Sequence, residues 1–334
     1  MADTPDLGSG ARACRFKSCY PQKQKRMVID HPFLFRTHSV RNLRFKVSLR
    51  LTQARKELIY LIAIYDGGRY NFYKCGVNVF LWEGMRNMIY ELVDTSKAEH
   101  LFEGWEETLI YSCLQKVMGK IYVTDLEAPR AAMAFVGCFG FYAGEPDEEL
   151  VINKPKGFAI MVPQNREWAK LIEKSFGDAK KVKRFAIKKG TFFNEEELKR
   201  KVCMLPEGYE LRKIDAELYD RCLENPLTAD FVASFNDKNH FLEMGRGVVI
   251  IKDGEIVSGA SSYSRYREGI EIEVDTLEHE RRKHLATVAC AELILNCLSE
   301  GLYPSWDAQN MNSVHLAEKL GYEFDHEYDA YEVN

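Results

Sequence analysis

The chain has 334 residues, of which 46% are hydrophobic and 29% are charged, and its formal net charge is −4. These values are typical of a soluble protein with enough apolar side chains for two modest domains, and so small a net charge gives little reason to expect a nucleic-acid partner. Apolar runs are too short for a membrane span, so we expect no membrane partner. The 9 cysteines form no C-x-x-C pair, which predicts reduced thiols in a cytoplasmic protein and no metal site.

Residues 1–87 are untypical of a folded domain. The sequence Arg-Phe-Lys-Ser at 15–18 can be encoded by codons that contain the T-arm consensus of a transfer RNA gene. This pattern suggests a reading frame extended upstream, with Met85 or Met88 as better starts than Met1. The alternative is an ordinary, poorly ordered basic tail. We therefore expect 1–87 to be an N-terminal extension outside the folded domains, and we leave the true start of translation open.

Residues 88–193 have the pattern of a first folded half. Periodicity predicts a helix at 97–118, strands at 131–136, 139–143 and 158–162, and a helix at 166–176. The basic run at 180–189 alternates with Val182 and Phe185, which favours a strand with a solvated face. The turn at 163–165 has no basic residues that could hold a diphosphate, so we expect this half to be a scaffold or to enclose a substrate. Residues 194–208 should link it to the second half.

The second half, 209–334, begins with a predicted strand at 209–214 and helices at 216–223 and 231–244. Two further strands, 247–252 and 255–266, are joined by Asp253 and Gly254, a strong hairpin signal. In the next strand, 269–276, apolar residues alternate with Glu271, Glu273 and Asp275. This period of two places the three carboxylates on one face.

A basic turn follows the acidic strand and opens a helix. From Leu285 on, apolar residues recur along one helical side until Gly301 ends the pattern. The first N–H groups of this helix lack intrahelical partners, and with the basic side chains at 281–283 they could hold a pyrophosphate. A solvated charge run balancing Glu278 and Glu280 is the alternative.

Two motifs carry a resemblance to a known family. Arg281-x-x-His284-x-Ala286 resembles the Arg/Gln-x-x-Gly-x-Gly/Ala motif with which GNAT N-acetyltransferases bind acetyl coenzyme A (acetyl-CoA). Segments 303–310 and 313–322 are similar to the family's fifth strand, fourth helix and final Gly-aromatic turn. Segments 99–108, 141–146, 160–165 and 257–264 resemble the branch that contains zwittermicin A resistance proteins. The resemblance implies an α/β fold with mixed (α+β) sheets: a GNAT acyl-CoA N-acyltransferase fold at 209–334 and a degenerate GNAT-like half at 88–193.

The resemblance also implies a function and a site. An acetyl group would pass from acetyl-CoA, without a metal, to a primary amine of a small molecule, for which an amino-polyol antibiotic is a candidate, by direct attack in a ternary complex. Glu273 is the first choice of general base and Glu271 the second. The acetyl-CoA site would comprise Val274, Asp275, Thr276, Arg281, Arg282, Lys283, His284, Leu285, Ala286, Thr287, Asn310 and Ser313. Candidates for the acceptor side are Ser261, Tyr263, Trp306 and Asp307.

Several alternatives stay open. Glu271 and Glu273 could instead pair with Arg265 or Arg267 across the sheet, and Trp306 could be a core residue. His284 replaces the family's usual glycine, and Ala317 stands where many members have a tyrosine proton donor. A non-catalytic acyl-CoA-binding sensor module and a protein or peptide N-acetyltransferase therefore remain alternatives. The acceptor and the oligomeric state cannot be read from the sequence.

Overall fold

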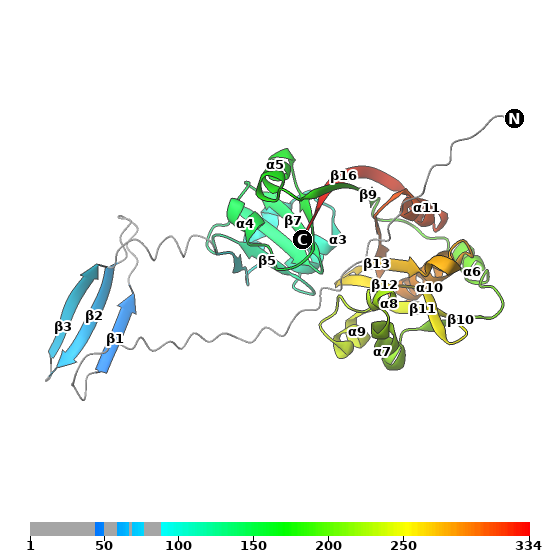
Figure 1. The fold of residues 1–334 in the computed structure, drawn as a ribbon, viewed down its shortest axis with the longest axis horizontal. Helices are drawn as coiled ribbons and strands as arrows, with labels where there is room; N and C mark the ends of the chain where they lie inside the picture. The colour runs from blue at the N-terminus through cyan, green and yellow to red at the C-terminus, as the bar shows by residue number, and fades with distance from the viewer. Residues whose placement is uncertain (1–43, 50–58, 67–68, 77–87) are drawn as a thin grey trace. The chain divides into compact units, whose positions relative to one another are not determined.

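The structure is a computed structural model that describes residues 44–49, 59–66, 69–76 and 88–334 (Figure 1). In the first part, β1 (Arg44–Leu49), β2 (Ile59–Asp66) and β3 (Arg69–Gly76) form an antiparallel sheet in chain order. The interpretations of Met1, of 15–18 and of Met85 lie outside the described residues. That 1–87 is an extension outside the catalytic fold stays a prediction.

Residues 89–334 form one compact unit that contains two mixed sheets. The five-stranded sheet has the order β10 (Tyr209–Lys213), β11 (Gly247–Lys252), β12 (Glu255–Tyr266), β13 (Gly269–Thr276) and β14 (Tyr303–Ser305). The predicted hairpin between β11 and β12 is confirmed. Its turn residues Asp253 and Gly254 have φ of 49° and 80°, as a tight hairpin turn requires. Only the last pair, β13 and β14, is parallel.

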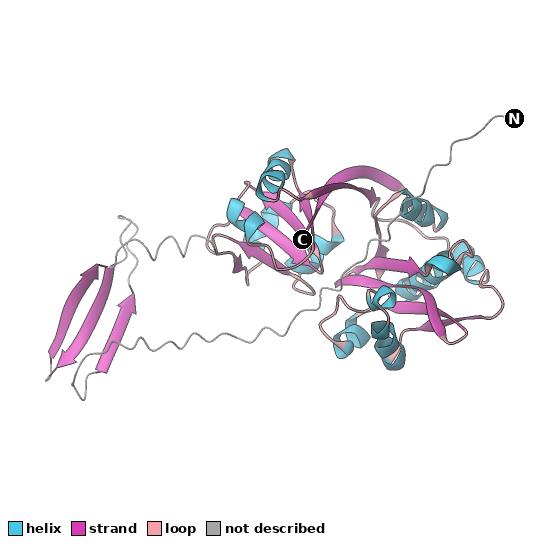
Figure 2. Ribbon diagram, viewed as in Figure 1, coloured by secondary structure: helices cyan, strands magenta, loops and turns pink. Residues whose placement is uncertain are grey.

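Helices cover both faces of this sheet (Figure 2). On one face lie α7 (Ala216–Glu224), α8 (Pro226–Ala229) and α9 (Lys238–Met244); on the other lie α6 (Glu195–Val202) and α10 (Leu285–Ser299). Along β11, Val249 and Ile251 join the core with α7 and α9, whereas Val248 and Ile250 join the core with α10. Burial on both faces explains why this strand is an unbroken apolar run.

The second sheet has eight strands in the order β15-β9-β16-β8-β7-β6-β5-β4. Its strands are β4 (Tyr90–Glu91), β5 (Lys120–Val123), β6 (Ala131–Val136), β7 (Phe139–Gly144), β8 (Ala159–Pro163), β9 (Lys180–Ile187), β15 (Asp307–Ala308) and β16 (Phe324–Val333). Helix α3 (Thr108–Leu114) packs on one face, and α4 (Glu148–Ile152) and α5 (Arg166–Ser175) pack on the other. The mixed α/β fold with mixed sheets is the predicted one.

The strand pairing does not follow the predicted division at 194–208. The final strand, β16, lies between β8 and β9, and β15 pairs with the outer edge of β9. Residues from the end of the chain therefore complete the sheet of the first half, so the two halves share strands. The short helix α11 (Met311–Lys319) connects β15 to β16.

Two predicted segments differ in detail from a simple connection or a single helix. The segment 194–208, predicted to link the halves, contains α6, which Asn194 caps and which buries Leu198 in the core with α10. The predicted helix at 97–118 is broken into α2 (Ser96–Glu99), η1 (His100–Phe102) and α3. The break follows from Gly104, whose φ of 76° lies outside the helical region. No helix in the described ranges is long and apolar enough to cross a membrane.

Candidate active site

The two strands of the parallel pair β13 and β14 separate partway along β13. They pair only from Gly269 to Glu271, opposite Tyr303 to Ser305. Beyond this point β13 continues to Thr276, while the chain after β14 turns to pair with β9. The edge of β13 from 272 to 276 therefore faces an opening on this side, where the N–H of Thr276 donates to the Asp275 carboxylate at 2.7 Å.

The corresponding pair in the first half, β7 and β8, stays closed. Its parallel pairing continues to Tyr142 opposite Pro163. Just past the pair, the side-chain amide oxygen of Gln164 accepts the N–H of Gly144 at 3.0 Å, while the Gln164 backbone N–H donates to Tyr142 at 3.0 Å. A side chain thus fills the position that corresponds to the opening in the second half.

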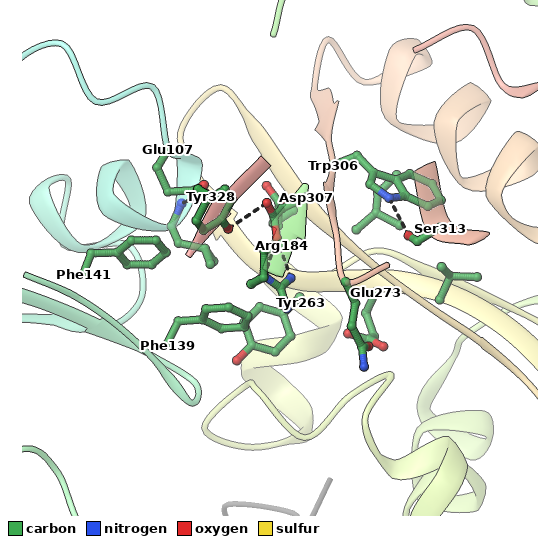
Figure 3. Close-up of a pocket in the computed structure, with 15 residues that line it drawn as sticks. Glu107, Phe139, Phe141, Arg184, Tyr263, Glu273, Trp306, Asp307, Ser313 and Tyr328 are labelled. Atoms are coloured by element: carbon green, nitrogen blue, oxygen red, sulfur yellow. Dashed lines mark hydrogen bonds and ion pairs between the residues drawn. The ribbon is translucent and has the colours of Figure 1, made fainter. Parts of the chain in front are cut away.

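A cavity of about 80 Å³ lies at the opening of β13 and takes its walls from both halves (Figure 3). Seven of the predicted site residues line it: Tyr263, Glu271, Glu273, Val274, Trp306, Asp307 and Ser313. Ser261 is fully buried and is absent from the described lining. Glu271 and Glu273 both line the cavity, and Ile272 and Val274 of the same strand contribute to it as well.

Glu273 is a half-buried carboxyl group in an acidic environment. Burial raises its pKa to about 8, and the neighbouring Asp230 and Asp275 act in the same direction, while Arg184 opposes them. Burial, together with Asp275, also raises the pKa of Asp230 to about 6. A carboxyl group with a pKa near the working pH is suited to exchange protons with a substrate.

Glu271 is 4% exposed, and only one of its two carboxylate oxygens has a hydrogen-bond donor. Its Oε2 accepts a hydrogen bond from the hydroxyl of Thr108 at the start of α3, and its Oε1 is buried without a hydrogen-bond partner. The alternative of a pair with Arg265 is not observed, because Arg265 donates to the carbonyl of Gly269 at 2.7 Å.

Glu107 is a site residue that the sequence analysis missed. It is the N-cap of α3, is 7% exposed and lines the same cavity. Burial raises its pKa; the neighbouring Glu271 and Asp307 add to the effect, and the ammonium group of Lys189 works against it. The available signal was the Glu-Thr pair at 107–108 within a segment that already resembled the family.

Both carboxylate oxygens of Asp307 are bound by other side chains. Its Oδ1 lies 2.5 Å from a guanidinium nitrogen of Arg184 on β9, and its Oδ2 accepts from the hydroxyl of Tyr328 on β16 at 2.8 Å (Figure 3). The side chains of Arg184 and Asp307 are 10% and 7% exposed. The predicted solvated face of 180–189 is present at Lys181 and Lys183, whose side chains are half-exposed, whereas Arg184 points to the opposite face and packs 4.8 Å from the ring centroid of Phe139. Asp307 therefore joins the two halves.

Trp306 and Tyr263 form part of the cavity wall. Trp306 is 2% exposed and donates its indole N–H to the hydroxyl of Ser313 at 3.1 Å, which agrees with the core alternative. Tyr263 lies at a bulge in β12, and its hydroxyl accepts the backbone N–H of Cys138 at 2.9 Å. Its ring packs edge-on against Phe139, with the centroids 5.6 Å apart.

The basic turn before α10 has the geometry of an anion cradle. His284 is the N-cap, with φ 65° and no side-chain capping bond, and Arg282 also has φ 65°. The first N–H groups of α10 therefore have no side-chain acceptor. The ammonium group of Lys283 forms an ion pair with Glu280 at 2.8 Å. Hydrogen bonds from Lys283 and Tyr209 lower the pKa of Glu280 to about 2, although its desolvation acts in the opposite direction. Of the three predicted basic residues, Arg281 and Arg282 remain exposed toward solvent.

The remaining predictions concern the last helix. Asn310 caps α11 by accepting the N–H of Ser313 at 3.1 Å. Ala317 is fully buried, and the hydroxyl of Tyr322 donates to the carbonyl of Pro304 at 2.6 Å, so neither offers an acid to the cavity. Within the described part of the chain, no group of three His, Cys, Asp or Glu side chains could hold a metal ion.

A parallel strand pair that separates beside an uncapped, basic helix N-terminus offers a place for an elongated ligand that carries an anionic group. The family model described as GNAT acetyltransferase matches residues 99–331, and the chain belongs to this family. It is similar to a GCN5-related N-acetyltransferase-like protein from Streptococcus suis 89/1591, with 46% identity, a TM-score of 0.69 and coverage of 72% of this chain and 98% of that one. It is also 25% identical over 243 residues to the uncharacterized N-acetyltransferase YdfB of Bacillus subtilis strain 168, covering 67% of this chain and 89% of that protein.

Proposed function

We propose that this acyltransferase transfers the acetyl group of acetyl-CoA to a primary amine of a small molecule, with Glu273 as the general base. The observation that carries the proposal is the opening of β13 beyond Glu271, with Glu273 in the cavity beside it. The catalytic part would be 209–334, completed by the first half at 88–193.

The residues around the opening fit acetyl-CoA as co-substrate. The free edge of β13 at 274–276 would bind the pantetheine arm, and the first-turn N–H groups of α10 with Arg281 and Arg282 would bind the diphosphate. Ser313, in the first turn of α11, lines the cavity, and Asn310 caps that helix. His284 already adopts the left-handed conformation that glycine favours, so the cradle forms despite its Cβ.

The reaction follows from the protonation states. An alkyl amine has a pKa of about 10 and is almost fully protonated at pH 7, so a base must take a proton before attack. The Glu273 carboxylate accepts this proton, the amine nitrogen forms a bond to the thioester carbonyl carbon, and the carbon–sulfur bond breaks. The backbone N–H of Thr276 already donates to Asp275 at 2.7 Å, so the N–H of Val274 would stabilise the negative oxygen of the tetrahedral intermediate.

The departing thiolate takes a proton from water, because neither Ala317 nor Tyr322 provides an acid. The amide nitrogen releases its second proton to the hydroxide so formed, and Glu273 returns its proton to solvent.

A small acceptor is favoured over an extended peptide because the cavity holds only about 80 Å³ and aromatic rings form part of its wall. The resemblance to zwittermicin A resistance proteins keeps an amino-polyol among the candidates. We infer a cytoplasmic location from the proposed co-substrate and from the buried thiols of Cys290 and Cys297.

Calorimetry with acetyl-CoA on the full chain, followed by thiol release against a panel of amines, tests the proposal. Binding with amine-dependent thiol release is the expected result. Binding without release for any amine favours the sensor alternative. Absence of binding would refute the proposed co-substrate site.

A further inference from the structure

We propose that the cavity contains a subsite for a second cationic group of the acceptor, formed by Glu107 and Glu271, and that the preferred acceptor is an aliphatic diamine. This inference rests on the proposed function. It adds to it the chemical class of the acceptor and gives the first half a direct role in recognition.

The charge of the cavity is the first observation. Four carboxylic acids, Glu107, Glu271, Glu273 and Asp307, line it together with one guanidinium, Arg184. Because Arg184 and Asp307 pair with each other, the carboxyl groups that line the cavity without a cationic partner are those of the three glutamates. Within the described ranges, none of these three forms an ion pair with a cationic side chain.

An unsatisfied buried atom is the second and independent observation. The Oε1 of Glu271 has no hydrogen-bond partner, although the residue is only 4% exposed and lines the cavity. A buried carboxylate oxygen left without a donor costs free energy, and a bound ammonium group would supply the missing donor. Thr108, which holds the other oxygen of Glu271, is adjacent to Glu107, so both carboxyl groups lie at the start of α3.

The nearby cation does not fill this place. Lys189 donates to the hydroxyl of Ser305 at 2.7 Å and approaches the carbonyl of Trp306 at 3.4 Å. Its charge reaches Glu107 and Glu271 only through space. The ammonium of Lys189 is thus oriented by neutral oxygens, and the free oxygen of Glu271 stays available to a ligand.

The spacing of the two carboxylates on β13 gives the length of the acceptor. Glu271 and Glu273 are two residues apart on one strand face, which corresponds to about 6.6 Å. The two nitrogen atoms of an extended diamine with four or five methylene groups have a similar separation. The rings of Phe139, Phe141 and Tyr263 provide apolar and cation–π contacts for such a chain.

The experiment compares four acceptors on the full chain: 1-aminobutane, 4-amino-1-butanol, 1,4-diaminobutane and 1,5-diaminopentane. A diamine has two equivalent amines, which alone would double kcat/KM relative to 1-aminobutane. We expect kcat/KM from thiol release to be at least about tenfold higher for the better diamine after this factor of two is removed. In Glu271→Gln and Glu107→Gln this corrected ratio should fall toward one. Glutamine keeps the hydrogen bonds to Thr108 and to the N–H of Leu109, so the fold should persist. Glu255→Gln, an exposed change in the β11–β12 hairpin, should leave the ratio unchanged.

The outcomes separate the two proposals. Equal transfer to mono- and diamines would overturn the subsite and leave the transferase standing. If acetyl-CoA binds but no amine is acetylated, the proposed function fails, and calorimetry of 1,4-diaminobutane with the protein–coenzyme A complex decides the subsite. If the diamine binds to the wild type and not to Glu271→Gln, the subsite is supported. If the diamine does not bind to the wild type, the subsite is overturned.

Discussion

Replacing Glu273 with glutamine should remove the general base while preserving the shape of the cavity. Removal of such a base lowers the rate by about 10²–10⁴-fold. Because the pKa of Glu273 is about 8, roughly one tenth of the wild-type carboxyl groups are ionised at pH 7. The wild-type rate should therefore rise about tenfold per pH unit below pH 7 and level off above pH 8, apart from the ionisation of the amine itself.

The sign of this effect makes the variant most damaging at high pH. At pH 9 the Glu273 carboxyl group of the wild type is ionised, and the full loss of rate in the variant is expected. At pH 6 only about one hundredth of the wild-type groups are ionised, so the ratio of wild-type to variant rate should be about a hundredfold smaller than at pH 9. The assay is the pH profile of kcat/KM from thiol release with one amine. The inflection near pH 8 should vanish in Glu273→Gln, leaving only the rise that follows amine ionisation.

A second variant tests the origin of the pKa. Asp230 helps to raise the pKa of Glu273, so Asp230→Asn should move the wild-type inflection to lower pH. Asp253→Asn, in an exposed hairpin turn that tolerates asparagine, is the matched control and should leave the profile unchanged. A Glu273→Gln enzyme that keeps the wild-type rate and the inflection near pH 8 would refute the assignment of the base.

Three further predictions concern the cradle and the joint between the halves. His284→Gly should relieve the left-handed backbone, raise the free energy of unfolding by up to about 1 kcal/mol and leave acetyl-CoA binding intact; weaker binding in calorimetry would show that the imidazole contacts the co-substrate. Asp307→Asn should lower the free energy of unfolding in urea by about 3 kcal/mol because Arg184 loses its buried counter-charge, and a loss below about 1 kcal/mol would contradict this. A chain that ends at Glu323 lacks β16, which pairs on both sides, so it should fail to fold; a cooperative unfolding transition by circular dichroism would argue against the inserted strand.

Local patterns predicted the elements well where one physical requirement dominated. The alternation along 269–276 gave β13 and the shared face of Glu271 and Glu273, because a strand with one apolar face has a period of two. The Asp253–Gly254 pair identified the hairpin, since both turn positions need positive φ. The basic turn and the apolar stripe from Leu285 identified α10 and its uncapped start.

The tertiary structure alone decided which half each strand completes and what surrounds the carboxylates. Nothing local in 324–333 indicates insertion between β8 and β9, because strand pairing depends on hydrogen bonds between segments far apart in the chain. For the same reason the basic run at 180–189 gave no sign that Arg184 would be buried against Asp307. The raised pKa of Glu273 also needs Asp230, which is more than forty residues earlier, and a wall supplied by the first half. Residue types and spacing therefore determined the chemistry available to this protein, whereas the long-range packing determined where that chemistry is brought together.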